Sequence, residues 1–240
     1  MATGLGLIGQ KVGMTQVFDS EGRAVGATVL HAGPCTVTRL LKVETNGYSA
    51  VQVGYRDEKP ARIGKARAGV FAKLNLPTQR VLAEFRVPET GELAPGTKLT
   101  VEIFQQGGRV DVSGDAKGAG FQGVVRRHGF KGGPETHGSM SHRAPGSIGS
   151  STDPGHTLRG TRMAGRHGGR NTTSQNLEVI AVDAGRNILV VKGAVPGSTG
   201  TYVRITPTTR KKAPSARRIR VEVVDSEGFK TAAKKAATKK

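Results

Sequence analysis

The stretch that decides how this chain folds is residues 118–170, GAGFQGVVRRHGFKGGPETHGSMSHRAPGSIGSSTDPGHTLRGTRMAGRHGGR. Its 53 residues include 14 glycines, and large apolar residues are too sparse to sustain either the helical or the strand period. Burial therefore cannot offset the entropy cost of ordering so long a loop. An insert of this length inside a compact domain is typical of a functional or a disordered segment. We expect a partner outside the chain to order it.

The charge of this insert indicates the chemistry of that partner. Eight lysines and arginines and five of the six histidines lie here against two acids, Glu135 and Asp153, which gives a net charge of +6. Glycine lets a backbone come close to a ligand, arginine forks onto phosphates, and histidine or arginine planes stack on bases. We therefore predict an extension that penetrates folded RNA. The predicted phosphate-binding residues are Arg126, Arg127, Lys131, Arg143, Arg159, Arg162, Arg166 and Arg170. The residues predicted to stack or to bond phosphate and 2′-hydroxyl groups are His128, His137, His142, His156 and His167.

Charge elsewhere is concentrated at the end of the chain. The whole chain of 240 residues carries +19, and residues 207–240 hold eleven basic residues against three acids. A basic run of this composition stays disordered and binds anions without sequence preference. We expect a disordered basic tail over 207–240, interrupted at most by a strand at 219–224. Its predicted RNA contacts are Lys234, Lys235, Lys239 and Lys240.

The remaining residues predict a mainly β fold. Short apolar runs separated by glycine, proline and asparagine predict strands at 5–8, 14–18, 24–30, 36–42, 48–55, 80–87, 98–104, 109–112, 176–183, 187–192 and 202–206. Residues 68–74 predict a short helix. The strands after the insert are too few for a sheet of their own. We therefore expect one β-barrel domain from 1–117 and 171–206, interrupted by the extension at 118–170.

Several other functions are disfavoured. A single cysteine and the lack of a signal peptide or an apolar run of 18 residues predict a cytoplasmic protein without a membrane partner. The histidines lack cysteine or carboxylate companions, so we expect no metal site. Gly118, Gly120 and Gly123 match a dinucleotide-binding pattern, but the helix and the later acid that this pattern needs are missing. We expect no cofactor, no small-molecule substrate and no enzymatic activity.

Five separated motifs carry a resemblance to a known family. They are 4–18 (GLGLIGQKVGMTQVF), 31–38 (HAGPCTVT), 129–149 (GFKGGPETHGSMSHRAPGSIG), 162–169 (RMAGRHGG) and 187–197 (NILVVKGAVPG). Together, and in this order, they resemble the bacterial form of the third protein of the large ribosomal subunit. The resemblance spans nearly residues 2–206. The tail and Ser150, which stands where many bacterial members carry a methylated glutamine, depart from that family.

The resemblance implies a more specific role. It implies a translation-factor-type β-barrel, direct binding to large-subunit ribosomal RNA near its 3′ end, contact with neighbouring ribosomal proteins and a part in early subunit assembly. It also implies that the extension approaches the peptidyl transferase centre. The alternative is a free-standing RNA-binding or RNA-modifying protein that uses its histidine-rich extension. Phe121, Phe130, Met140 and Ile148 are open to two interpretations, stacking on bases or packing the base of the extension against the barrel.

Overall fold

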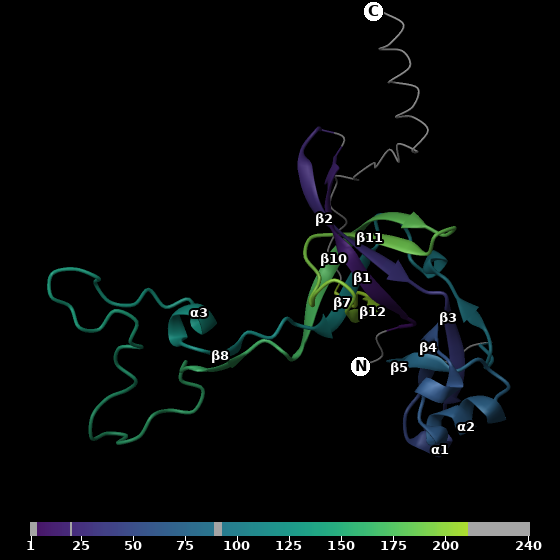
Figure 1. Cartoon of the computed structure of the whole chain (residues 1–240), viewed down its shortest axis with the longest axis horizontal. Coiled ribbons are helices and arrows are strands. Elements are labelled where there is room, and N and C mark those ends of the chain that lie inside the picture. The colour runs from purple at the N-terminus through teal and green to yellow at the C-terminus, as the bar shows by residue number, and fades with distance from the viewer. Residues whose placement is uncertain (1–3, 20, 89–92, 211–240) are drawn as a thin grey trace, which may run out of the picture. The chain divides into compact units, whose positions relative to one another are not determined.

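The computed structural model describes residues 4–19, 21–88 and 93–210 (Figure 1). Its internal contacts divide the chain into two compact units. One unit combines Met1–Gly114 with Thr173–Lys240, and we call it the globular unit. The other is Asp115–Thr172, which contains the basic insert, and we call it the arm. The predicted strand at 219–224 and the predicted tail contacts from Lys234 to Lys240 lie outside the described residues.

Six strands form a closed barrel in the order β1-β12-β7-β10-β11-β2 (Figure 1). They are β1 (Leu7–Phe18), β2 (Ala24–Ala32), β7 (Arg109–Asp115), β10 (Asn171–Asp183), β11 (Ile188–Lys192) and β12 (Tyr202–Pro207). The strand pairs of the barrel whose registers are known are antiparallel. The prediction of a mainly β fold is confirmed. The barrel combines strands from before and after the arm, and β12 lies between β1 and β7.

A second sheet of four strands completes the globular unit. It runs β5-β4-β3-β6 and consists of β3 (Cys35–Leu41), β4 (Ala50–Asp57), β5 (Gln79–Arg86) and β6 (Lys98–Leu99). The helices α1 (Val43–Asn46) and α2 (Lys65–Lys73) and the 3-10 turns η1 (Pro60–Arg62) and η2 (Val101–Ile103) connect these strands or follow them. Sequence reasoning did not separate this sheet from the barrel, since period and turn signals are the same in both.

The two sheets share one mainly aliphatic core. Leu7 and Leu30 of the barrel are fully buried in the same cluster as Val37 and Val53 of the second sheet. Cys35 joins them, and its thiol donates to the carbonyl oxygen of Ile8 at 3.3 Å. Burial raises the pKa of this thiol to about 12, although the contact with Ile8 acts in the opposite direction. Cys35 is therefore a small core residue.

The first two predicted strands, at 5–8 and 14–18, are wrong as separate strands. Residues 7–8 and 14–18 belong to one strand, β1, whose pairing with β2 shifts register between Lys11 and Gly13. This bulge bends the strand without ending it. Gly9, inside β1, is a point of close approach, since an added Cβ would lie 3.0 Å from the carbonyl oxygen of His31.

Two further element boundaries need correction. The predicted strand at 98–104 ends at Leu99 and gives way to the turn η2. Val101 and Phe104 are both buried, and their spacing of three residues suits a 3-10 turn rather than a strand. The predicted helix at 68–74 is α2, which begins one turn earlier at Lys65. Its first turn is charged, so apolar periodicity could not reveal it.

Candidate nucleic-acid interface

The arm begins and ends in a short paired neck. Strand β8 (Gly120–Gln122) pairs with β9 (Gly165–His167), with Phe121 opposite Arg166. Next to this pair, the amide of Ala116 donates to the carbonyl of Arg170 at 3.0 Å, and the amide of Gly169 donates to the carbonyl of Ala116 at 3.1 Å. These backbone bonds bring the two ends of the insert together.

Glycine is required where the two neck segments touch. Gly168 has a φ of +69°, and an added Cβ would collide with the carbonyl oxygen of Lys117. Gly165 lies against the guanidinium of Arg127, so an added Cβ there would require this side chain to move. Some glycines of the arm are therefore needed for the backbone geometry of the arm itself.

A short helix, α3 (Val124–His128), follows β8 and ends at Gly129, which adopts a left-handed conformation. Two side chains of this helix contact the backbone of the returning half of the arm. Nη1 of Arg127 donates to the carbonyl oxygen of Met163 at 2.6 Å, and Nε2 of His128 lies 3.0 Å from the same oxygen. Val124 is the only buried residue in 115–172. The arm therefore has fixed crossing points but no core of its own.

A second crossing lies further along the arm. The amide of Gly133 donates to the carbonyl of His142 at 3.0 Å, and Nδ1 of His142 lies 2.9 Å from the carbonyl oxygen of Pro134. Gly132 and Gly133 have no room for a side chain there, because the carbonyls of His142 and Ser141 occupy it. An open hollow of about 780 Å³ adjoins this crossing, and Lys131 lines it.

The charges of the arm are uncompensated. Among the residues that the structure describes, none of the eight lysines and arginines at 118–170 forms an ion pair. The two acids of the insert, Glu135 and Asp153, are exposed. Isolated surface charges of one sign create a potential that attracts a polyanion.

The structure sorts the predicted site residues into two groups. Four have an internal hydrogen-bonding contact from the side chain, and these are Arg127, His128, His142 and His156. For the other nine, no side-chain hydrogen bond is found among the described residues: Arg126, Lys131, His137, Arg143, Arg159, Arg162, Arg166, His167 and Arg170. Of these nine, all except half-buried His167 are exposed. The internal role of the first group was missed because its partners are backbone carbonyls, which no sequence pattern marks.

Several apolar side chains of the arm are also exposed. Phe121 is 78% exposed and Met140 is 97% exposed, and Ile148 also faces solvent. Phe130 is half-buried, and its ring centroid lies 6.1 Å from that of His128. Exposed apolar groups beside unpaired cations are suited to stacking on unpaired bases.

Two further kinds of site are absent from the described part of the chain. No group of three or more histidine, cysteine, aspartate or glutamate residues lies close enough to hold a metal ion within residues 4–19, 21–88 and 93–210. In the same residues, no helix is long and apolar enough to cross a membrane.

A β-barrel unit joined to a coreless arm of unpaired cations is typical of proteins that assemble with nucleic acid. Comparison with known proteins is more specific. Residues 86–188 match the family model of ribosomal protein L3. The large ribosomal subunit protein uL3 of Prochlorococcus marinus (strain NATL2A) is 46% identical over 211 residues, which cover 88% of this chain and 97% of that protein. The uL3 of Acidothermus cellulolyticus is 48% identical over 209 residues, which cover 87% of this chain and 94% of the relative.

This chain therefore belongs to the uL3 family of large ribosomal subunit proteins. The resemblance to the bacterial form, drawn from the five motifs, is confirmed. Proteins of this family are structural constituents of the ribosome, which acts in translation.

Proposed function

We propose that this protein binds large-subunit ribosomal RNA directly and that the arm is its principal RNA-binding element. The observation that carries the proposal is the set of eight lysines and arginines at 118–170 without an ion pair among the described residues. Desolvated arginine–phosphate pairs give charge-assisted bonds, and exposed arginines without a carboxylate partner are free to form them. A structural protein of this kind needs no reacting group.

The two groups of arm residues have different roles in this proposal. The exposed arginines, such as Arg143 and Arg159, neutralise phosphates. Arg127 and His142 instead hold the crossings that shape the arm, so they present other residues to the RNA. Lys131 binds phosphate at the wall of the hollow of about 780 Å³. Phe121 and Met140 are exposed enough to stack on bases.

The finer placement rests on the family resemblance. We propose that the globular unit is a translation-factor-type barrel that binds near the 3′ end of the RNA, beside neighbouring large-subunit proteins. We also propose that the protein enters the cytoplasmic subunit early in its assembly and that the arm points towards the peptidyl transferase centre. The tail lysines, Lys234, Lys235, Lys239 and Lys240, add salt-sensitive phosphate binding without fixed placement.

The alternative, a free-standing RNA-modifying enzyme, requires a general acid or base held by an orienting group. Within the arm, the hydrogen-bonding contacts of the histidine side chains are to backbone carbonyls, and none is to a carboxylate. This arrangement favours the structural role. A high-salt wash of ribosomes distinguishes the structural protein from the enzyme. A structural protein should stay with the large subunits, whereas an enzyme should also be found as a free pool.

Binding of the full-length protein to isolated large-subunit ribosomal RNA tests the proposal. In one variant, Arg126, Arg143, Arg159 and Arg162 are replaced by glutamine. In a matched control, Lys42, Lys98, Lys192 and Arg204 of the globular unit are replaced in the same way. We expect the affinity of the arm variant to fall at least about tenfold. The slope of its log affinity against log salt concentration should become shallower by about 0.7–0.9 for each phosphate that the variant no longer neutralises. Equal affinities for the arm variant and the control would overturn the proposal.

A further inference from the structure

A second concentration of positive charge lies in the globular unit. Residues 56–80 contain seven basic residues and two acids, a net charge of +5. The rest of residues 1–117 and 171–206 contain eleven basic and eleven acidic residues, so they are neutral. All the excess charge of the globular sequence outside the tail is therefore in one segment of 25 residues. The net charge of this part of the sequence, +5, does not by itself show where along the chain the excess lies.

The fold presents this segment on its surface. It runs from the end of β4 through η1 and α2 to the start of β5. All seven basic residues are exposed: Arg56, Lys59, Arg62, Lys65, Arg67, Lys73 and Arg80. We call this set the basic patch. A sequence segment that returns to the adjacent strand places both of its ends near each other, and β4 and β5 are paired from Ala50–Arg86 to Asp57–Gln79.

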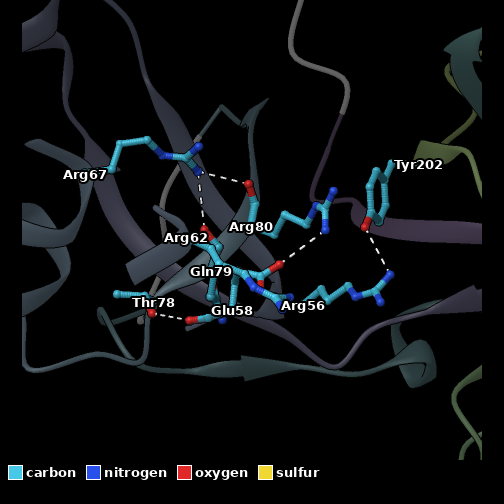
Figure 2. Close-up of polar contacts among 8 residues, drawn as sticks. All are labelled: Arg56, Glu58, Arg62, Arg67, Thr78, Gln79, Arg80 and Tyr202. Carbon is cyan, nitrogen blue, oxygen red and sulfur yellow. Dashed lines mark hydrogen bonds and ion pairs between the residues drawn. The ribbon is translucent and has the colours of Figure 1, made fainter. Parts of the chain in front are cut away.

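One acid organises the centre of the patch (Figure 2). Oε1 of Glu58 lies 3.3 Å from Arg62, and Oε2 lies 3.2 Å from Arg80. The Glu58 side chain is only 12% exposed, whereas those of Arg62 and Arg80 are 72% and 54% exposed. A single carboxylate thus holds two guanidinium groups from beneath and neutralises only one of their charges. The outer faces of both arginines remain available to an anion.

Two further arginines of the patch are held in place (Figure 2). Nη2 of Arg67 donates to the carbonyl oxygens of Gln79 and Arg80, at 3.3 Å and 3.0 Å. Nη1 of Arg56 donates to the hydroxyl of Tyr202 at 3.2 Å. Arg56 also has a φ of 62°, a conformation that is uncommon for residues other than glycine. Side chains that are already ordered lose less entropy when they bind a partner.

The patch lacks the groups that recognise unpaired bases. The only aromatic residue of segment 56–80, Phe71, is 2% exposed, and the one large apolar residue exposed in that segment is Val70. The arm differs, since it exposes Phe121 and Met140. RNA double helices are recognised through their phosphates and 2′-hydroxyl groups, whereas unpaired bases are recognised by stacking. Cations without exposed aromatic rings therefore suit a duplex backbone.

We propose that the basic patch is a second RNA-binding surface, which grips the phosphate backbone of a double-helical segment of ribosomal RNA. This inference rests on the proposed function, that the chain binds large-subunit RNA directly. The patch fixes position on the RNA without reading its sequence, because phosphates carry no base information.

The test uses the three lysines of the patch, for which no side-chain contact is found among the described residues. In the full-length protein, Lys59, Lys65 and Lys73 are replaced by glutamine, and the control replaces Lys42, Lys192 and Arg204. Both proteins lose three charges, and thermal unfolding verifies that both are folded. Hydroxyl-radical cleavage then maps backbone protection on isolated large-subunit RNA, and base-specific chemical probes map protection of base edges.

We expect the patch variant to lose one block of backbone protection in a duplex region, while base-edge protections and the control footprint stay as in the wild type. The slope of log affinity against log salt concentration should become shallower by about 2–3, because three phosphates would no longer be neutralised. An RNA footprint of the patch variant identical to that of the control variant would overturn the inference. A patch variant that, in reconstituted subunits, lost only its contact with a neighbouring protein would overturn it too. Failure of the wild type itself to bind RNA would instead overturn the proposed function, so the two failures are distinguishable.

Discussion

Nη1 of Arg127 lies 2.6 Å from the carbonyl oxygen of Met163, so a side chain on α3 holds a backbone segment 36 residues further along the chain. The guanidinium also packs on Gly165, the first residue of β9. One arginine therefore connects the outgoing and the returning halves of the arm. This gives Arg127 a structural role that differs from the phosphate binding predicted for it.

Arg127→Met should loosen the neck without unfolding the globular unit. The hydrogen bond that this change removes is worth about 1 kcal/mol, so amide exchange of residues 165–167 should accelerate by roughly fivefold. Hydrogen exchange monitored by mass spectrometry measures the change. Arg126→Met is the matched control, because Arg126 precedes it on the same helix and is exposed. Equal exchange in the two variants would contradict the structural role.

Gly168→Ala should open the neck more strongly than Gly138→Ala. Both glycines have a positive φ, +69° and +73°, so both alanines meet a similar backbone penalty of about 1–2 kcal/mol. Only at Gly168 would the new Cβ also collide, with the carbonyl oxygen of Lys117, whereas Gly138 has open space. We expect exchange of the 116–119 amides to rise at least about tenfold in Gly168→Ala, since about 1.4 kcal/mol corresponds to that factor. Amide exchange at 116–119 that is no faster in Gly168→Ala than in Gly138→Ala would refute the collision.

Lys11→Met should destabilise the barrel. The ammonium of Lys11, which is almost fully buried, donates to the carbonyl oxygens of Val195 and Gly197 at 2.7 Å and 3.1 Å. Methionine fills the space but leaves both carbonyls without this donor, which costs roughly 1–3 kcal/mol for each. Urea unfolding followed by circular dichroism measures the loss of stability, and Lys42→Met at an exposed position is the control. A change below about 0.5 kcal/mol, the range of ordinary surface substitutions, would show that the ammonium is not needed.

Glu58→Gln should change how stability depends on pH. Burial alone would raise the pKa of Glu58, but the ion pairs with Arg62 and Arg80 outweigh it and lower the pKa from its usual 4.5. A carboxyl with a lowered pKa in the folded state contributes stability that is present above the unfolded pKa and is lost as the pH falls through the folded value. The stability of the wild type relative to Glu58→Gln should therefore decline as the pH falls below 4.5. Urea unfolding from about pH 7 to about pH 3 tests this, with Glu44→Gln as control, and a pH-independent difference would contradict it.

Parts of the fold followed from local patterns. Alternation and turn residues located most strands, for example β2, β7 and β11, because these signals act over a few residues. The same local signals failed where distant contacts decide. Val101 and Phe104 take a 3-10 turn because both must reach the shared core, and β1 continues through Gly9 and Gly13 because it pairs with β2 on the other side of a turn.

The candidate site was predictable in composition and not in shape. The residues of the insert indicated a coreless basic arm, and the burial of Val124 alone agrees with that. The crossings at Met163 and Pro134 use backbone carbonyls, which every residue carries, so the sequence does not mark them. The basic patch around Glu58 depends on β5 returning beside β4, which only the fold reveals.

Photocrosslinking from Met140 in assembled large subunits tests most directly whether the arm lies in ribosomal RNA. Met140 is 97% exposed, so a benzophenone amino acid fits there without disturbing the arm. A second probe at Val43 of α1, which is 63% exposed, serves as control. We predict that the probe at Met140 forms crosslinks to large-subunit RNA and that these map to the region of the peptidyl transferase centre. Crosslinks from Met140 only to proteins, or none at all in subunits that contain the protein, would contradict the proposed placement of the arm.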